Sequence, residues 1–270
     1  MVSFARVATA QLPAKSNEDR LVITAEMVII LDGATTYGIQ NKISGGTFAE
    51  RLGAVLVRIA DESASLSALL EVALQYVISD LELPIESPNA PSSTIAIVRK
   101  RRGTLDFLGL GDSTIVLGYR DGAVETICDE RLEQLGLVQS RKYRSRLQQG
   151  GGYDDRHREI LAELQQEQRR RRNRPGGYWI ASTAPEAAQH AIIAARPVAD
   201  IAWVALATDG VTDLIDALKV DWQEIGSMDS AKLSALLARI HRWEYEVDPD
   251  GILVPRSKRH DDKAIAVVRL

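Results

Sequence analysis

The chain has 270 residues, a formal net charge of -4, 45% hydrophobic residues and 26% charged residues. This composition excludes a disordered chain and argues against a nucleic-acid binder, which needs clustered basic charge. The apolar runs, such as residues 27–31, are too short for a membrane span of about 20 residues. The N-terminus lacks a secretory signal, and a single cysteine, Cys128, excludes an intrachain disulfide. We therefore expect a cytoplasmic monomer that binds neither nucleic acid nor a membrane.

The first third of the chain predicts two strands followed by two helices. Residues 2–11 and 21–31 are rich in Val, Ile and Ala between polar breaks, a composition typical of strands. Apolar residues then recur at helical spacing over 48–59 and again over 66–81. Pro84 ends the second helix, because proline cannot continue a helix interior.

Residues 93–127 give the clearest β signal in the sequence. Strand-like runs at 94–98, 104–110, 113–119 and 123–127 are separated by short polar turns. The last of these turns contains Asp-Gly, which favours a hairpin. We therefore predict an antiparallel meander.

The second half begins with a polar segment, 129–174, that is dense in Arg, Gln and Glu and is interrupted by Gly150-Gly151-Gly152. We expect two polar helices separated by a glycine hinge, packed through one narrow face or mobile. Further strands are predicted at 178–181, 202–207 and 263–270, and further helices at 185–195, 211–219 and 231–243. Because no linker divides the chain, we expect one domain over 1–270 with a flap-like insertion at about 129–178.

Acidic residues recur where the predicted strands end. They are Glu18-Asp19, Asp32-Gly33, Asp112, Asp209-Gly210 and Asp261-Asp262. A single Asp-Gly after a strand is usually only a turn, because these residues dominate turns. Carboxylates gathered at one sheet edge would repel one another unless cations are bound. Hard ions such as Mg²⁺ or Mn²⁺ prefer such oxygen ligands.

The order of these motifs resembles that of the metal-dependent protein phosphatases, the type 2C serine/threonine family in its bacterial, single-domain form. The similarity covers nearly the whole chain. It rests on Asn17-Glu18-Asp19, the strand ending in Asp32-Gly33, Gly45-Gly46 before a helix, Ser93-Thr94 before a strand, Gly111-Asp112-Ser113, residues 207–213, and Asp261-Asp262 before the last strand. The resemblance implies an α+β fold, an αββα four-layer sandwich of two mostly antiparallel sheets flanked by helix pairs.

The same resemblance implies a site for two Mn²⁺ or Mg²⁺ ions and a third, weaker one. The implied ligands are Asp32 bridging two ions, the carbonyl oxygen of Gly33, Asp209 and Asp261 on one ion, Glu18 and Asp19 through waters on the other, and Asp112 with Asp209 on the third. Two such ions acidify a water for attack at phosphorus. The implied activity is therefore hydrolysis of phosphoserine and phosphothreonine in phosphoproteins.

Two positions depart from the family pattern. The family usually places an arginine four residues before the acidic pair. Here Ala14 stands there with Lys15 beside it, and lysine offers a point charge without a bidentate fork. Asp32-Gly33 is followed by Ala34-Thr35-Thr36 without the usual histidine. His260, next to Asp261, is therefore the candidate proton donor, and its unperturbed pKa suits that task.

Some alternatives remain open from the sequence. The basic run Arg169–Arg174 is either a solvated helix end, which we favour because charge runs usually face water, or a surface that attracts acidic phosphoprotein substrates. The chain is a phosphatase, a catalytically degenerate member of the same fold that binds a phosphoprotein or partner, or an unrelated sandwich. Ala14 and the altered loop after Gly33 favour the degenerate member, whereas the retained acidic motifs oppose it.

Overall fold

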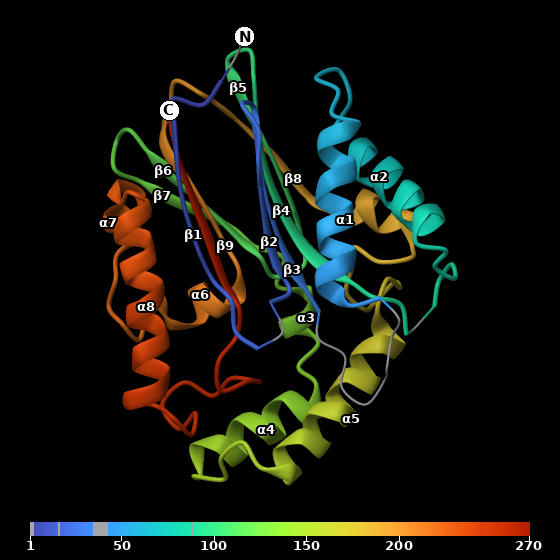
Figure 1. Cartoon of the computed structure of the whole chain (residues 1–270), viewed down its shortest axis with the longest axis vertical. Helices are drawn as coiled ribbons and strands as arrows, with labels where there is room; N and C mark the ends of the chain where they lie inside the picture. Colours follow the sequence, from blue (N-terminus) through green and yellow to red (C-terminus); the bar gives the residue numbers. More distant parts are fainter. Residues whose placement is uncertain (1–2, 16, 35–42, 88) are drawn as a thin grey trace.

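Two five-stranded antiparallel sheets lie face to face at the centre of the protein (Figure 1). The computed structural model describes residues 3–15, 17–34, 43–87 and 89–270. One sheet has the order β1 (Arg6–Leu12), β10 (Lys263–Arg269), β9 (Ile201–Ala207), β6 (Thr114–Tyr119) and β7 (Val124–Ile127). The other has the order β2 (Asp19–Ile23), β3 (Met27–Gly33), β4 (Ser93–Arg101), β5 (Thr104–Leu110) and β8 (Ile192–Pro197).

Alternating side chains along the strands build a four-layer sandwich. In β3, Val28 and Ile30 belong to the core between the sheets, whereas Ile29 and Leu31 face the helices outside. The outer helices are α1 (Gly45–Arg58) and α2 (Leu66–Asp80) on one side, and α6 (Asp209–Ile215), α7 (Trp222–Ser227) and α8 (Ser230–Glu246) on the other. The predicted αββα fold class is confirmed.

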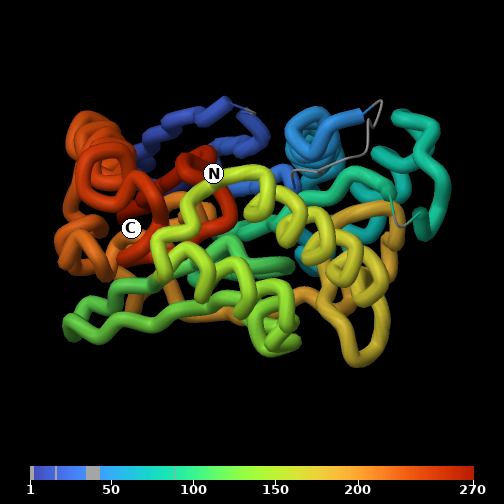
Figure 2. The backbone as a smooth tube through the Cα atoms, turned by 90° about the horizontal axis from the view of Figure 1, so that it is seen from below, coloured from blue at the N-terminus to red at the C-terminus, as the bar shows by residue number. Residues whose placement is uncertain are grey.

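Three further helices lie across one end of the sandwich, as the view from below shows (Figure 2). They are α3 (Arg131–Gln134), α4 (Val138–Gln148) and α5 (Asp155–Arg171). Helices α4 and α5 are the two polar helices that the sequence predicts, and the glycines at 150–152 lie between them. They share a small apolar cluster of their own, which includes Leu147 and Leu161. That the whole chain forms one domain stays a prediction.

The predicted meander over 93–127 is instead two hairpins in different sheets. Strand β4 pairs with β5 in one sheet, and β6 pairs with β7 in the other. Residues 111–113 therefore carry the chain from one sheet to the other. Asp112 therefore lies in the connection between the two sheets. In the predicted meander it would have lain in a turn at the edge of a single sheet.

Three other predicted elements also differ in the structure. Residues 178–181 form no strand and make only isolated bridges, Tyr178 with Arg172 and Ala181 with Ser93. Residues 21–31 form most of the hairpin β2–β3 and not one strand, because Thr24 Oγ1 accepts a hydrogen bond from the amide of Met27 at 2.9 Å and closes a turn. Residues 185–195 are not one helix. A short 3-10 helix, Pro185–His190, is followed by β8, whose backbone pairs with β5.

Two close backbone contacts hold the acidic motifs in place. A Cβ atom added to Gly33 would lie 2.5 Å from the carbonyl carbon of Gly45, so the end of β3 touches the start of α1. A Cβ atom added to Gly210 would lie 2.0 Å from the carbonyl oxygen of Asp262. Gly33 ends β3 and Gly210 lies in α6, and neither has a positive φ. These Asp-Gly pairs therefore serve close packing, and the turn interpretation does not apply to them.

The contact at Gly210 can be tested by whether an added methyl group raises or lowers the stability of the protein. Helix propensity alone favours alanine over glycine by about 1 kcal/mol, whereas overpacking against backbone costs about 1–3 kcal/mol. We expect Gly210→Ala to lower the melting temperature of the metal-free protein. Gly109→Ala is the matched control, because its added Cβ would meet only Ile127 Cγ2 at 4.0 Å. Equal melting temperatures for the two variants would contradict the contact.

Candidate metal centre

Both sheets deliver acidic residues to the same edge. Asp19 begins β2 and is the register partner of Asp32 near the end of β3. In the other sheet, Asp209 follows β9 and Asp261 precedes its neighbour β10. Asp112 lies where the chain crosses from β5 to β6. Antiparallel neighbours present opposite ends to one edge, so residues far apart in the sequence meet there.

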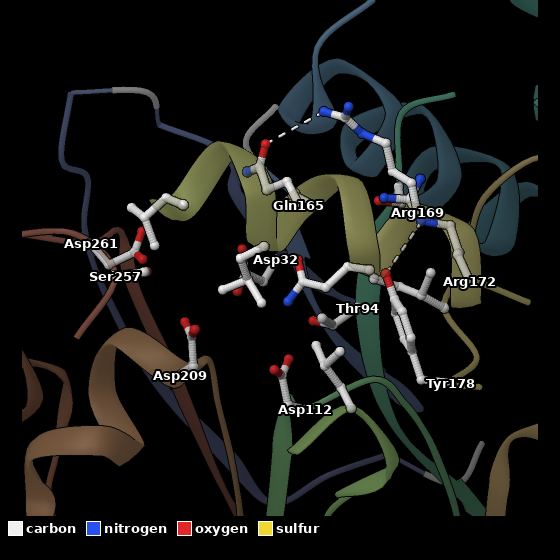
Figure 3. Close-up of a pocket in the computed structure, with 18 of the residues that line it drawn as sticks. Asp32, Thr94, Asp112, Gln165, Arg169, Arg172, Tyr178, Asp209, Ser257 and Asp261 are labelled. Carbon is white, nitrogen blue, oxygen red and sulfur yellow. Dashed lines mark hydrogen bonds between the residues drawn. The ribbon is translucent and has the colours of Figure 1, made fainter. Parts of the chain in front are cut away.

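Four of these carboxylates line a cavity of about 190 Å³ beneath α5. Figure 3 shows Asp32, Asp112, Asp209 and Asp261 around one open space, whereas the Arg169 side chain extends away from them towards Gln165. The residues that complete the cavity wall include Gln165, Gln168, Arg172 and Tyr178. A second opening of about 310 Å³ shares Asp112, Asp209 and Asp261 and continues beneath α4. These four carboxylates, Asp32, Asp112, Asp209 and Asp261, form an acid cluster between the sheet edge and the helices α4 and α5.

Burial and mutual repulsion raise the pKa values of Asp19, Asp32 and Asp209. Burial raises the pKa of Asp19 to about 7, with Asp261 and Asp262 adding to the shift and a hydrogen bond from Thr208 opposing it. The pKa of Asp32 lies well above its ordinary value, through burial first and then the charge of Asp209. The pKa of Asp209 is raised in the same way by burial and by Asp261. The metal-free site therefore concentrates more negative charge than its surroundings stabilise.

Lys258 supplies positive charge within the cluster. Its Nζ donates a hydrogen bond to Asp261 Oδ1 at 2.7 Å. Burial lowers the pKa of Lys258, but the charges of Asp261 and Asp32 raise it further than burial lowers it. One ammonium group therefore faces four carboxyl groups, and the metal-free cluster lowers its negative charge by binding protons at Asp32 and Asp209.

Asp262 anchors the backbone behind the cavity. Its Oδ1 accepts a hydrogen bond from the amide of Ala14 at 2.5 Å, and its Oδ2 accepts one from the amide of Glu18 at 2.6 Å. Thr208 Oγ1 donates to Asp19 Oδ2 at 2.8 Å. These bonds fix the segment before β2 against the segments that carry Asp209 and Asp261. Asp262 thus positions the site, a role that the sequence alone did not suggest.

The structure brings together most of the residues singled out from the sequence. Asp32, Gly33, Asp112, Asp209 and Asp261 line the cavity. Glu18 and Asp19 are buried beside it, and the carbonyl oxygen of Glu18 accepts a hydrogen bond from the amide of Gly33 at 3.3 Å.

Lys15 and His260 do not line this cavity. The side chain of Lys15 is exposed. His260 Nδ1 lies 2.9 Å from Glu244 Oε2, outside the acid cluster. Thr35 and Thr36, in the loop expected to carry the family histidine, lie outside the described residues.

His260 belongs to a separate polar group. Within the described part of the chain, His241, Glu244 and His260 are the only set of three or more His, Cys, Asp or Glu residues whose ligand atoms all lie within 4.8 Å of one another. Lys263 Nζ already donates to buried Glu244 at 3.0 Å, so its charge is neutralised without a metal. The carboxylates of the acid cluster stand farther apart, as expected for like charges that surround an open space.

Sequence reasoning assigned no role to several residues that line the openings, among them Asp213, Gln168 and Lys258. Asp213 lies four residues after Asp209 on α6, so the two share one helix face, and this spacing was a usable signal. For Lys258, the only signal in the sequence was its position three residues before Asp261. Nothing in the sequence distinguished Gln168.

The basic run Arg169–Arg174 contains both cavity-lining and solvent-exposed arginines. Arg169 and Arg172 line the cavity. Arg170 and Arg171 are exposed and pair with Glu167 at 3.1 and 3.4 Å. Neither interpretation therefore holds for the whole run, because part of it is solvated and part of it reaches the site.

Comparison with solved structures identifies the fold. PppA from Pseudomonas aeruginosa, described as a key regulatory component of T6SS, matches with a TM-score of 0.58 and 18% identity over 99% of this chain and 98% of its own. The Mycobacterium tuberculosis serine/threonine phosphatase PstP/Ppp matches with a TM-score of 0.58 and 15% identity over 98% of each chain. The catalytic domain of PstP in complex with two manganese ions matches with a TM-score of 0.55 and 14% identity over 98% of this chain and 97% of its own.

This chain has the fold of the PPM-type serine/threonine phosphatases. The resemblance to the type 2C family is thereby confirmed at the level of the phosphatase fold. No protein-family model matches the sequence, and no curated protein matches it. Within the described ranges, none of the helices has the length and apolar character needed to cross a bilayer.

The raised pKa values predict how stability depends on pH. Asp19 titrates near 3.8 when unfolded and at about 7 in the fold, so the folded state binds its proton more tightly. The stability that this proton provides is lost as the pH rises through about 7. We expect the melting temperature in chelator to fall between about pH 5 and about pH 8, a loss of about 2 kcal/mol.

The control is the same series with Mn²⁺. Cations compete with protons for the carboxylates, so added metal should cancel or reverse the fall. A melting temperature in chelator that is flat or rising over this range would contradict the charge balance described for the cluster.

Proposed function

We propose that this protein is a metal-dependent phosphatase that hydrolyses phosphoserine and phosphothreonine in phosphoproteins. The observation that carries the proposal is the acid cluster: carboxylates from both sheets surround one cavity, and the pKa values of Asp32 and Asp209 among them are raised. The phosphatase fold supports it, and one protein of that fold was crystallised with two manganese ions.

The donor set fits hard divalent cations. Carboxylate oxygens face the cavity, and no thiol or imidazole is among its described lining residues. We assign Asp32, Asp209 and Asp261 to two Mn²⁺ or Mg²⁺ ions, with the Gly33 carbonyl oxygen beside them. Glu18 and Asp19 would hold waters, and Asp112 would share a third ion with Asp209. When bound, such ions acidify a water and neutralise charge on the phosphoryl group.

Basic residues of the cavity would orient the phosphoryl group. Arg169 and Arg172 line the same cavity as the carboxylates, and guanidinium groups bind phosphate oxygens as bidentate forks. We assign them the role that the sequence suggested for Lys15, because Lys15 is exposed outside the cavity. No proton transfer is assigned to His260, because its ring is bonded to Glu244 and does not line the cavity.

A phosphoprotein-binding member of this fold without turnover is the second candidate. Ala14 favours it, because it leaves the segment before β2 without the expected arginine. The acid cluster opposes it, since buried like charges are costly to keep without a use. Hydrolysis of p-nitrophenyl phosphate with Mn²⁺ separates the two, and no turnover at millimolar metal would favour the binding protein.

Asp209→Asn tests the cluster itself. Thr208 is the N-cap residue of α6 and Asp209 is the first helical residue, so the change does not remove the cap. We expect turnover of p-nitrophenyl phosphate to fall by orders of magnitude, because a charged ligand is lost. The melting temperature in chelator should rise, since a like-charged pair about 4 Å apart costs up to about 4 kcal/mol at an effective dielectric constant of about 20.

The matched control is Asp216→Asn at the exposed C-terminal end of the same helix. It should keep wild-type turnover and the wild-type increase in melting temperature with Mn²⁺. If Asp209→Asn behaves as this control does, Asp209 is not a ligand and the proposal loses its central residue.

The cavity-lining arginines give a second test. Arg169→Gln should raise the KM for a phosphothreonine peptide about tenfold, because hydrogen bonds to charged groups contribute about 1.5–3 kcal/mol. Lys15→Gln should leave both kcat and KM unchanged. The opposite pattern, with a raised KM only for the lysine variant, would restore the role that the sequence suggested for Lys15.

A further inference from the structure

A separate basic cavity adjoins the metal centre. Its volume is about 140 Å³, and Arg169 and Arg172 line both it and the metal-centre cavity. The two arginines therefore form the wall between the two openings. Arg174 lines the second cavity only, together with the buried residues Ser182 and Thr183. Three arginines from one short segment thus surround a space next to the catalytic one.

These arginines have no carboxylate partner among the described residues, whereas most half-buried arginines of the protein have one; Arg269, which donates only to backbone carbonyl oxygens, is an exception. Arg99, Arg196 and Arg256 are also at least half-buried, and each pairs with a carboxylate. No ion pair of Arg169, Arg172 or Arg174 occurs among the described residues. A half-buried guanidinium without an anion is unfavourable, so the cavity has the charge of an unfilled anion site.

The hydrogen-bond acceptors of the two shared arginines are all neutral, and two of the three bonds are long. Arg172 donates from Nη1 to the carbonyl oxygen of Ala90 at 3.1 Å and from Nε to Tyr178 Oη at 3.5 Å. Arg169 donates to Gln165 Oε1 at 3.5 Å. Burial lowers the pKa of Arg169, and the neighbouring charge of Arg172 lowers it further. An anion between them would relieve that repulsion.

The cavity also has two glutamates, which do not reverse its charge. Glu86 and Glu186 are exposed, so water and salt screen them, whereas Arg169 and Arg172 are half-buried. Arg174 is exposed like the glutamates, so the lining has three positive and two negative side chains, and its two half-buried charges are both positive.

We propose that this second cavity binds an acidic or phosphorylated side chain next to the phosphorylated residue that the metal centre hydrolyses. The proposal rests on the proposed function and narrows its substrates to phosphoproteins with a second anionic group nearby. Arginine forks bind carboxylate and phosphate alike. Because the cavities share a wall and extended chain advances about 3.3 Å per residue, the second group would lie within a few residues of the first.

The experiment uses three phosphothreonine peptides that differ only at the flanking positions, which carry Ala, Glu or phosphoserine. The measured quantity is the ratio of kcat/KM between each acidic peptide and the Ala peptide, with Mn²⁺ present. We expect a ratio of about ten or more for the wild type. Arg174→Gln should reduce the ratio towards one, and the Glu and phosphoserine arms show which anion the cavity prefers.

Arg170→Gln is the matched control. Arg170 has the same charge, is exposed, pairs with Glu167 and lines neither cavity. The kcat/KM ratio of the Arg170→Gln variant should therefore equal that of the wild type. A wild-type ratio near one overturns the proposal. So does an equal loss in the two variants, which would mean that diffuse surface charge attracts the substrate.

Failure of the catalytic proposal is distinguishable from failure of this one. If the wild type hydrolyses neither the peptides nor p-nitrophenyl phosphate, the proposed function is wrong. Fluorescence anisotropy of the same labelled peptides, measured in chelator, then tests the cavity alone. An anion site is supported if the wild type binds the acidic peptides more tightly than the Ala peptide, and if this difference is lost in Arg174→Gln and kept in Arg170→Gln. Equal binding of all three peptides overturns it.

Discussion

Repulsion among half-buried carboxylates is the constraint around which this site is arranged. Asp32, Asp209 and Asp261 come from two sheets and face one cavity, where Lys258 supplies the only basic group bonded to the cluster among the described residues. Holding such charges together requires a rigid backbone. The close contacts at Gly33 and Gly210, and the hydrogen bonds of Asp262, provide it. The sandwich supplies this rigidity and holds the carboxylates close together despite their repulsion. Cation binding would relieve that repulsion.

The helices α4 and α5 complete the site from outside the sandwich. Without them the carboxylates would lie at an open sheet edge, and water would screen their charges. With them, the cavity at the negative sheet edge is also lined by Arg169 and Arg172. A phosphorylated side chain in this cavity would meet both the cations and the guanidinium groups. Their combined positive charge, more than any single residue, favours a phosphate ester as the ligand.

Sequence reasoning succeeded where the signal is local and failed where the partner is distant. The Asp residues at strand ends were recognised because apolar runs and turn residues adjoin them. The separation of the hairpins β4–β5 and β6–β7 into different sheets, and strand β8, depend on pairing between distant segments. Lys15 and His260 were chosen for adjacency to acidic residues, but neighbouring side chains along an extended chain point in different directions. Lys258 and Arg172 reach the cavity only through the tertiary fold.

The central claim is that the acid cluster binds divalent cations, and anomalous diffraction from a crystal grown with Mn²⁺ tests it most directly. The account predicts anomalous peaks inside the cavity, within coordination distance of Asp32, Asp209 and Asp261. An empty cavity at saturating Mn²⁺, or peaks only beside His241, Glu244 and His260, would contradict it.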